Sequence, residues 1–292
     1  MPPKVTPFGS QDYWNNRFTA NSHPFEWLEA PTALDPHLFA ALKHTNDENP
    51  EILHIGCGTS LLSDHLRAHI NNPAQIHNLD YSEVAITVGR KREVDLYANK
   101  DAIRDQLPAT SKPQRPTYMR WSTANLLDHS SLLTCCQPST YSIVVDKSTS
   151  DSIACSEDVY VPLPYPVSIS RDPHSSSSSE HTTSFEPIHP LHVLAIHLAL
   201  VSKPKARWIS LSYSTDRFPF LHHPPPELHK QELERAGLPN PGTLWRLEAK
   251  YEIEVPPAAA PEDSNGTIHR PQILHWVYVL ERTDVEVAVR DS

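Results

Sequence analysis

Two of the chain's glycines lie within three positions of each other, in the segment Gly56-Cys57-Gly58-Thr59-Ser60. Glycine is scarce in this chain, with 7 in 292 residues. Two glycines this close together therefore indicate a backbone conformation or a close contact that other residues cannot provide. Small residues at a turn let the backbone approach a ligand, and a helix that follows offers free N–H donors to an anionic group. A tight connection between a strand and a helix, without any ligand, is the alternative that this motif alone leaves open.

A carboxylate stands 24 residues after Gly56, at Asp80, where the next apolar run ends. Ligands of open α/β sheets bind beyond the carboxyl ends of the strands, and an acidic residue at about this spacing can accept hydrogen bonds from ribose hydroxyls. The glycine turn and Asp80 together predict a ligand that contains a nucleoside. The third glycine of the dinucleotide fingerprint is missing, and no GK[ST] follows to form a triphosphate-binding loop. Asp146-Lys147, after a later apolar run, is a further candidate position at the same edge.

These positions must be held by strands and helices, and the hydrophobic periodicity predicts an alternation of the two. The expected strands are residues 51–55, 75–79, 117–121, 141–145 and 206–213. The expected helices are residues 61–70, a segment from about 83 onward, and 188–202. This alternation predicts an α/β fold, Rossmann-like and doubly wound, with a mainly parallel sheet and helices on both faces. Two late runs, 246–255 and 272–282, complete seven strands with an antiparallel addition at the edge.

Proline and serine are concentrated outside these elements. The 29 prolines are about twice the usual number, and many fall in residues 156–187, 222–243 and 256–271. The first of these segments holds a run of five serines at 175–179, and we expect it to be a flexible insertion that buries little. The other two are expected to be Pro-rich loops. The length and the 38% of hydrophobic residues suit a single domain over residues 1–292.

The composition disfavours several classes of protein. A net charge of −10 without a Lys/Arg-rich run argues against nucleic-acid binding, and no apolar stretch approaches the roughly 18 residues that span a bilayer. Residues 1–14 show neither a signal peptide nor a targeting presequence, and the four cysteines have no CxxC spacing. We therefore expect a cytoplasmic protein in a reducing compartment. The 18 histidines are mostly scattered and HExxH is absent, so we expect no metal site.

The order strand, GxG, helix, strand, Asp resembles that of the class I, seven-β-strand S-adenosylmethionine-dependent methyltransferases. A narrower resemblance is to the eukaryotic lysine methyltransferases that act on translation elongation factor 1-alpha, together with the related citrate synthase lysine methyltransferase. The segments that match extend over most of the chain. They are residues 8–18 (FGSQDYWNNRF), 25–27 (FEW), 53–60 (LHIGCGTS), 79–84 (LDYSEV), 144–151 (VVDKSTSD) and 274–280 (LHWVYVL).

The resemblance implies S-adenosylmethionine as the cofactor, beneath an N-terminal lid formed by residues 1–30. The cofactor-binding positions that it carries over are Trp14, Phe18, Trp27, Gly56, Gly58, Asp80, Tyr81, Ser122, Thr123 and Lys147. Among these, the three aromatic residues would form the lid and the two glycines would face the methionine part. Asp80 would bind the ribose hydroxyls, Tyr81 would lie against the adenine, and Lys147 would lie near the methionine end.

The chain departs from the resembled pattern at three positions. Ser122 replaces an acidic residue near the adenine, and Ser148 and Ser150 replace a glycine and a leucine in the loop after the fourth strand. That loop would shape the acceptor side, so these changes bear on the substrate more than on the cofactor. Methyl transfer from a sulfonium needs positioning and exclusion of water more than a dedicated base. Asp146 is the only acid that we single out as a candidate catalytic group.

Three functions remain open on this evidence. The first is transfer of a methyl group to a lysine side chain, and the resemblance implies an elongation-factor-like protein as the partner. The second is a small-molecule methyltransferase on the same fold. The third is a nucleoside-binding module without catalysis. A small-molecule enzyme should have a closed apolar acceptor pocket, whereas a protein methyltransferase should have an open acidic groove beside Asp146.

Overall fold

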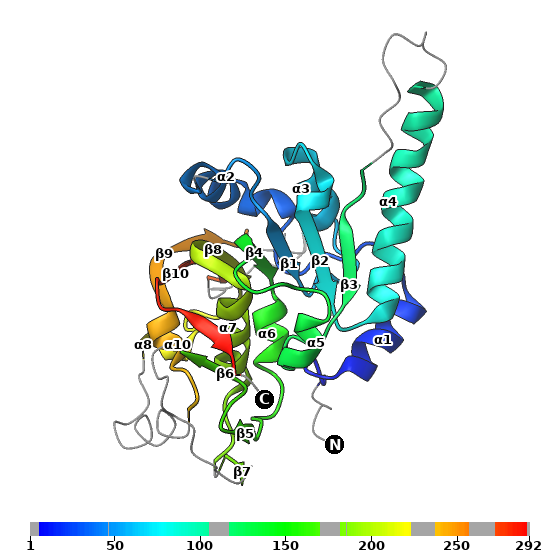
Figure 1. Ribbon diagram of the computed structural model, residues 1–292. Helices are drawn as coiled ribbons and strands as arrows, with labels where there is room; N and C mark the ends of the chain where they lie inside the picture. The colour runs from blue at the N-terminus through cyan, green and yellow to red at the C-terminus, as the bar shows by residue number, and fades with distance from the viewer. Residues whose placement is uncertain are drawn as a thin grey trace, which may run out of the picture.

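A seven-stranded sheet forms the centre of the protein (Figure 1). The computed structural model describes residues 6–45, 47–104, 117–169, 182–184, 186–222, 237–256 and 272–290. In spatial order the strands are β3 (Arg120–Thr123), β2 (Ile76–Asp80), β1 (Ile52–Ile55), β4 (Tyr141–Lys147), β8 (Ser202–Ser212), β10 (Leu274–Arg282) and β9 (Trp245–Glu254). The first five are parallel, and β10 is antiparallel to both of its neighbours. The predicted α/β, Rossmann-like fold is confirmed.

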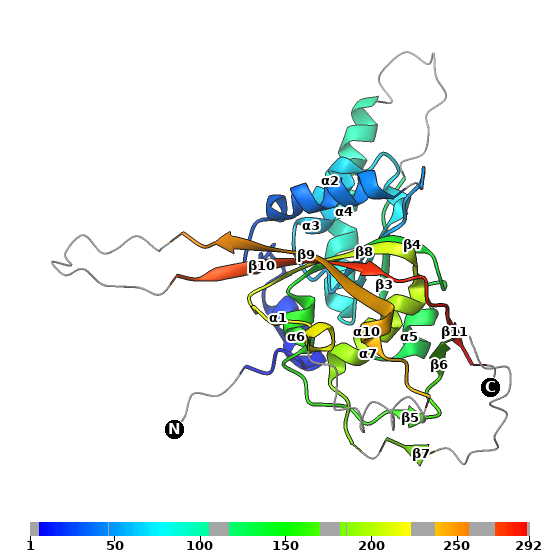
Figure 2. The same ribbon diagram turned by 90° about the vertical axis from the view of Figure 1, so that its left-hand side faces the viewer.

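Helices lie on both sides of this sheet, as Figure 2 shows. One side carries η1 (Pro31–Leu34), α2 (Asp35–His44), α3 (Leu62–His69) and α4 (Glu83–Arg104). The other side carries α5 (His129–Leu133), α7 (Pro190–Val201) and α10 (Pro241–Leu244). The remaining short elements are α1 (Gln11–Ala20), η2 (Pro73–Gln75), α6 (Thr149–Ile153) and α8 (Pro219–His222). None of the described helices combines the length and the apolar character needed to cross a bilayer.

The central strands are apolar on both faces, because both faces are covered. In β4, Ile143 and Val145 pack on the side of α2 and α3, while Val144 packs on the side of α7. Strands buried on both faces have continuous apolar sequences, which is why the sequence predicted this strand well. Helix α7 is buried at every residue except His192, and its sequence is correspondingly apolar all round.

Strand β3 begins three residues later than the sequence predicted. The backbone N–H of Met119 donates to Glu93 Oε1 at 2.9 Å, and ladder pairing with β2 starts only at Arg120. The buried Glu93 also accepts hydrogen bonds from Trp121 Nε1 (2.8 Å) and from Arg67 Nη1 (2.5 Å). This carboxylate therefore ties α4 to α3 and to the edge strand.

The antiparallel strand lies second from the edge of the sheet and not at the edge itself. Strand β10 pairs with β8 from Trp276 opposite Ser212 to Glu281 opposite Arg207, and β9 then adds on its outer side. The chain reaches β9 first and returns through β10, so the strand of this sheet that comes last in the sequence fills the inner position.

Part of the expected insertion is packed into the fold. Val161, Tyr165 and Val167 are buried, and the Tyr165 hydroxyl lies 2.7 Å from Nε2 of the buried His197 on α7. Small sheets pair β5 (Pro162–Leu163) with β7 (Thr182–Thr183), and β6 (Val167–Ile169) with β11 (Val287–Val289). The expectation that residues 156–187 bury little is therefore wrong for the first half of the segment. Residues 170–181, which contain the serine run, lie outside the described residues, as do 223–236 and 257–271 of the expected loops.

Candidate functional site

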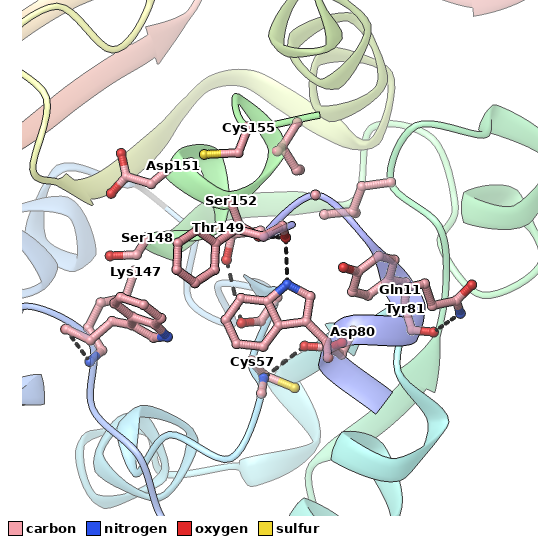
Figure 3. Close-up of a pocket in the computed structure, with 18 of the residues that line it drawn as sticks. Gln11, Cys57, Asp80, Tyr81, Lys147, Ser148, Thr149, Asp151, Ser152 and Cys155 are labelled. Carbon is pink, nitrogen blue, oxygen red and sulfur yellow. Dashed lines mark hydrogen bonds between the residues drawn. The ribbon is translucent and has the colours of Figure 1, made fainter. Parts of the chain in front are cut away.

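A cavity of about 930 Å³ lies beyond the carboxyl ends of β1, β2 and β4. It occupies the point where the strand order reverses, because the chain runs from β1 toward β2 and β3 on one side and places β4 on the other. Open α/β sheets bind ligands at such a switch point. Figure 3 shows Lys147, Ser148 and Asp151 at one end of this cavity, and Gln11 and Tyr81 at the other.

The loop after β1 needs both of its glycines. Gly56 has a φ of 55°, and a Cβ there would stand 2.2 Å from Oγ1 of Thr149. Gly58 has a φ of 50°, and a Cβ there would lie 3.3 Å from the ring of Phe18. Left-handed backbone disfavours other residues at both positions, and Thr149 leaves no room for a side chain at Gly56, whereas at Gly58 the ring of Phe18 would have to shift slightly. The floor of the cavity is consequently backbone at these two positions.

Asp80 ends β2 with its carboxylate at the cavity. Oδ2 accepts a hydrogen bond from the Gly58 N–H at 2.9 Å, and Oδ1 accepts one from the Ser82 N–H at 2.8 Å. Burial raises the pKa of Asp80 to about 6, although these backbone N–H groups oppose the shift. A carboxylate oxygen can accept two hydrogen bonds, so each oxygen keeps capacity for a donor on a ligand.

An aromatic cluster from the N-terminal segment covers the cavity. Trp14 and Phe18 on α1 stack with ring centroids 5.6 Å apart, and Trp27 meets Trp14 edge-on at 6.1 Å. The indole N–H of Trp14 donates to the carbonyl oxygen of Phe8 at 2.6 Å. All four side chains line the cavity. The segment from Phe8 to Trp27 thus forms a roof whose inner surface is mainly aromatic.

Lys147 is buried at the end of β4 and holds this roof in place. Its ammonium donates to the carboxylate of Glu26, to the carbonyl oxygen of Trp27 at 3.0 Å and to that of Glu29 at 3.1 Å. Burial lowers the pKa of Lys147, and the carboxylates of Glu26 and Glu29 oppose this shift. Only 2% of this side chain is exposed, so Lys147 is not a solvated surface lysine.

Glu26 joins the roof to a second strand end, and the sequence did not predict it as a site residue. Its carboxylate accepts hydrogen bonds from Ser60 Oγ at 2.9 Å and from the Leu61 N–H at 2.5 Å, in addition to Lys147. The one sequence signal for this role is an acidic residue between the aromatic residues Phe25 and Trp27. One carboxylate therefore connects the roof to the loop after β1 and to the end of β4.

Eight of the ten predicted cofactor-binding residues line this one cavity, and two do not. The eight are Trp14, Phe18, Trp27, Gly56, Gly58, Asp80, Tyr81 and Lys147. Ser122 lies on β3 with its hydroxyl 2.9 Å from Nε2 of His77, and Thr123 is exposed opposite Asp80. The cavity wall is formed instead by the next four residues, 124–127. The strand continues further than predicted, which moves the loop that faces the cavity to these later positions.

Asp146 is buried within the fold and does not line the cavity, so its geometry does not suit a catalytic group. It accepts hydrogen bonds from the N–H groups of Thr149 (2.8 Å) and Ser150 (3.2 Å), and from the hydroxyls of Ser150 and Ser210. Burial raises its pKa, and the two serine hydroxyls oppose that rise. Successive strand residues point to opposite faces, so Lys147 reaches the cavity while Asp146 caps α6.

The loop after β4 forms the end of the cavity opposite Tyr81. Ser148 has a φ of 64°, a left-handed conformation that favours the glycine of the resembled pattern and costs serine of the order of 1 kcal/mol. Ser150, by contrast, is buried against Asp146, so its departure from the pattern does not alter the cavity wall. Asp151 lines the cavity but is already bound by Arg217 Nε at 2.7 Å and by Ser212 Oγ at 2.5 Å.

Comparison with known proteins gives one curated relative and several structures of related shape. No family model matches this chain. It is similar to methyltransferase srdJ of Neurospora crassa, with 31% identity over 156 residues, which are 53% of this chain and 58% of the relative. The chain thus matches less than two thirds of the length of that relative.

Two solved structures align with nearly the whole chain. One is a SAM-dependent methyltransferase from Anabaena variabilis, with 10% identity over 96% of each chain and a TM-score of 0.47. The other is the N-methyltransferase NodS of Bradyrhizobium japonicum in complex with S-adenosyl-L-homocysteine, with 11% identity over 95% of this chain and 99% of that one, and a TM-score of 0.47.

The Glu26–Lys147 pair gives a first testable prediction. Glu26→Gln preserves the shape of the side chain but leaves the buried ammonium of Lys147 without its counter-charge. We expect the free energy of unfolding to fall by about 2 kcal/mol, less than for a fully buried pair because Glu26 is 25% exposed. Urea denaturation measures this change, and hydrogen exchange should show faster exchange of the roof amides.

The exposed Glu48 offers a matched control, since Glu48→Gln removes the same charge far from any buried cation and should change stability by less than about 0.5 kcal/mol. Adding Lys147→Met to Glu26→Gln should recover part of the loss, because no buried charge then remains. Equal stability of Glu26→Gln and the unaltered protein would contradict the role given to this pair.

Proposed function

We propose that this chain is an S-adenosylmethionine-dependent methyltransferase. The observation that carries the proposal is the buried carboxylate of Asp80, which stands beside a loop of bare backbone at Gly56 and Gly58 and beneath an aromatic roof. The similarity to methyltransferase srdJ over about half of the chain supports the same activity. The resemblance to class I methyltransferases predicts ten cofactor-binding residues, and eight of them line the cavity.

The lining fits a nucleoside with a charged amino-acid tail. Asp80 has free acceptor capacity for two ribose hydroxyls, and Tyr81 and residues 124–127 offer a partly apolar wall for a base. The backbone at Gly56 and Gly58 permits close approach of a polar tail. A volume of about 930 Å³ is near the upper end of the range for small-molecule sites, about 300–1,000 Å³, and leaves space for an acceptor as well.

The protein's contribution to the reaction is positioning and exclusion of water. S-adenosylmethionine supplies an activated methyl group on its sulfonium, so no residue has to act as a nucleophile. Trp14, Phe18 and Trp27 cover the site. The contact between Glu26 and Lys147 holds this roof against the ends of the strands. Holding the acceptor in line with the methyl group lowers the barrier, because the entropy of bringing the two groups together is lost on binding and not in the transition state.

The acceptor that the lining fits best is a small organic molecule with an apolar body. Phe25, Trp27, Ile153 and Tyr213 contribute apolar or aromatic surface, and Asp151 is neutralised by Arg217. The carboxylates among the described lining residues are those of Asp80 and Asp151, and each already has donors from the protein. The described lining therefore holds no unpartnered carboxylate that could attract the ammonium group of a lysine. The buried Asp146 also offers no acidic groove at the surface. A protein lysine remains the second candidate, and the motifs shared with the elongation factor and citrate synthase lysine methyltransferases favour it.

Replacing Asp80 tests the cofactor. Asp80→Asn keeps the shape of the side chain but removes the charge that accepts the ribose hydrogen bonds, so the affinity for S-adenosylmethionine should fall by about 10- to 150-fold. Isothermal titration calorimetry measures the affinity, and circular dichroism verifies the fold. Asp95→Asn, on an exposed face of α4, removes the same charge and should bind normally. Unchanged binding by Asp80→Asn would overturn the assignment.

The raised pKa of Asp80 predicts how binding depends on pH. Ribose hydroxyls donate to the carboxylate, so binding selects its ionised form. Above about pH 7 Asp80 is already ionised and the affinity should be constant, whereas below its pKa of about 6 the affinity should fall by up to about tenfold per pH unit. Calorimetry between about pH 5 and pH 8 tests this slope. No histidine is among the described lining residues, so a fall in affinity near pH 6 would not come from a histidine in the cavity. A flat profile would contradict the role of Asp80.

A labelling experiment separates the two acceptor classes. The purified protein is incubated with methyl-labelled S-adenosylmethionine and a cell extract, and the products are divided into small molecules and protein. We expect label among the small molecules. Label recovered as methyl-lysine after hydrolysis of a protein band would favour the second candidate, and Asp80→Asn is the background control. Absence of label from both fractions would contradict methyl transfer.

A further inference from the structure

Two histidines of α3 face one carboxylate of α2, away from the cavity. His65 and His69 are four residues apart, and this HxxxH spacing runs against the sequence-based expectation of no metal site. Residues at this spacing lie on the same face of a helix, so both imidazoles point in one direction. Asp35, the first residue of α2, stands opposite them. These three side chains supply the nitrogen and oxygen donors of common transition-metal sites.

The three donor atoms are already close to the spacing that a metal ion requires. Nε2 of His65 lies 2.5 Å from Oδ1 of Asp35, and Nε2 of His69 lies 4.0 Å from the same oxygen. One donor atom from each residue lies within 4.8 Å of the other two. Ligands about 2.0–2.2 Å from a tetrahedral zinc ion are about 3.3–3.5 Å from one another. Small side-chain rotations therefore suffice to form the site, and the helices need not move.

We propose that Asp35, His65 and His69 bind a divalent transition-metal ion, and specifically Zn²⁺. Imidazole and carboxylate suit Zn²⁺, whereas Mg²⁺ and Ca²⁺ prefer oxygen donors alone. The side chains are 20–29% exposed, so an ion reaches them from solvent and water completes the coordination. The net charge of −10 favours the approach of a cation.

The position of the site indicates a structural effect on the cavity. Helix α3 begins directly after the glycine loop at residues 56–60, and Asp35 follows Trp27, the last residue of the roof, by eight positions. A metal ion held by all three side chains joins the base of the roof to the helix that carries the glycine loop. This role is separate from methyl transfer and holds whether or not the proposed function is correct.

An Asp–His hydrogen bond without a metal is the competing explanation for the same contact. His65 can donate to Asp35 and stabilise the junction by itself, and His69 would then be an ordinary exposed side chain beside Phe39. The two explanations differ for Asp35→Asn and for His69→Ala. Asp35→Asn keeps a hydrogen-bond acceptor for His65 but removes the anionic ligand, and His69→Ala removes a ligand that makes no hydrogen bond to Asp35 at 4.0 Å.

The test uses the chain of residues 1–292 without an affinity tag, freed of metal by chelation. Addition of Co²⁺ should produce the visible absorption of a four-coordinate site, and Zn²⁺ should displace it with one equivalent. At Zn²⁺ about 100-fold above its Kd, the melting temperature should rise by about 5 °C or more. Asp35→Asn, His69→Ala and the double variant H65A/H69A should lose the Co²⁺ band and the Zn²⁺-dependent rise while remaining folded.

The exposed His23 provides a matched control, because His23→Ala removes a surface imidazole from outside the cluster. It should retain the band, the stoichiometry and the rise in melting temperature. The same Zn²⁺ stoichiometry and the same rise in the unaltered protein and in H65A/H69A would overturn the proposal, since the metal would then bind elsewhere. Failure of the unaltered protein to bind Co²⁺ or Zn²⁺ would overturn it as well.

Discussion

A lysine buried at a strand end must have its charge balanced, and that requirement organises the cavity. Lys147 is 2% exposed, and its balancing carboxylate comes from Glu26, which is 121 positions away in the chain. Because Glu26 lies in the N-terminal segment, satisfying Lys147 brings that segment across the carboxyl ends of the strands. The same carboxylate binds Ser60 and Leu61, so the roof is aligned with the glycine loop by the interaction that neutralises the lysine.

Asp80 is also a buried ionisable side chain, but backbone N–H groups and not a counter-ion stabilise its charge. Its two oxygens are held by the N–H groups of Gly58 and Ser82, which partly offset a burial that still raises its pKa to about 6. Burying a carboxylate costs free energy while some of its acceptor sites have no hydrogen-bond donor. A ligand with hydroxyl groups supplies those donors and lowers that cost. The most polar position in the cavity is therefore also the one where a hydroxyl-bearing ligand gains most. Asp146 and Asp151 show the contrast, because serine hydroxyls and Arg217 already satisfy them.

The sequence predicted the parts of the site that are encoded locally. Gly56, Gly58 and Asp80 stand at strand ends that apolar runs mark, and the mainly parallel sheet follows from the β-α alternation. Glu26 could not be found in this way, because its partners are 34 and 121 positions away and each looks ordinary in its own segment. The sequence could not separate Asp146 from Lys147, because adjacent strand residues face opposite ways and only Lys147 lines the cavity. The expected places of Ser122 and Thr123 depended on the end of β3, which pairs with β2 as far as Thr123 opposite Asp80.

The attachments of the roof to the body of the protein determine how readily the roof can move and widen access to the cavity. The roof is attached to the body of the protein partly by hydrogen bonds, such as those of Glu26 with Ser60, of Asn15 with Ser82, and of Phe8 with Ser152. It is also attached by the packing of its aromatic side chains against Ala85. Polar contacts exchange for water at a net cost of about 0.5–1.5 kcal/mol each, whereas a large apolar interface would open much less readily. The aromatic cluster is the apolar part, and its inner surface lines the cavity, where a bound ligand covers it again. Asp35 lies beyond this segment, so an ion held there would stiffen the base about which the roof moves and leave the roof itself free.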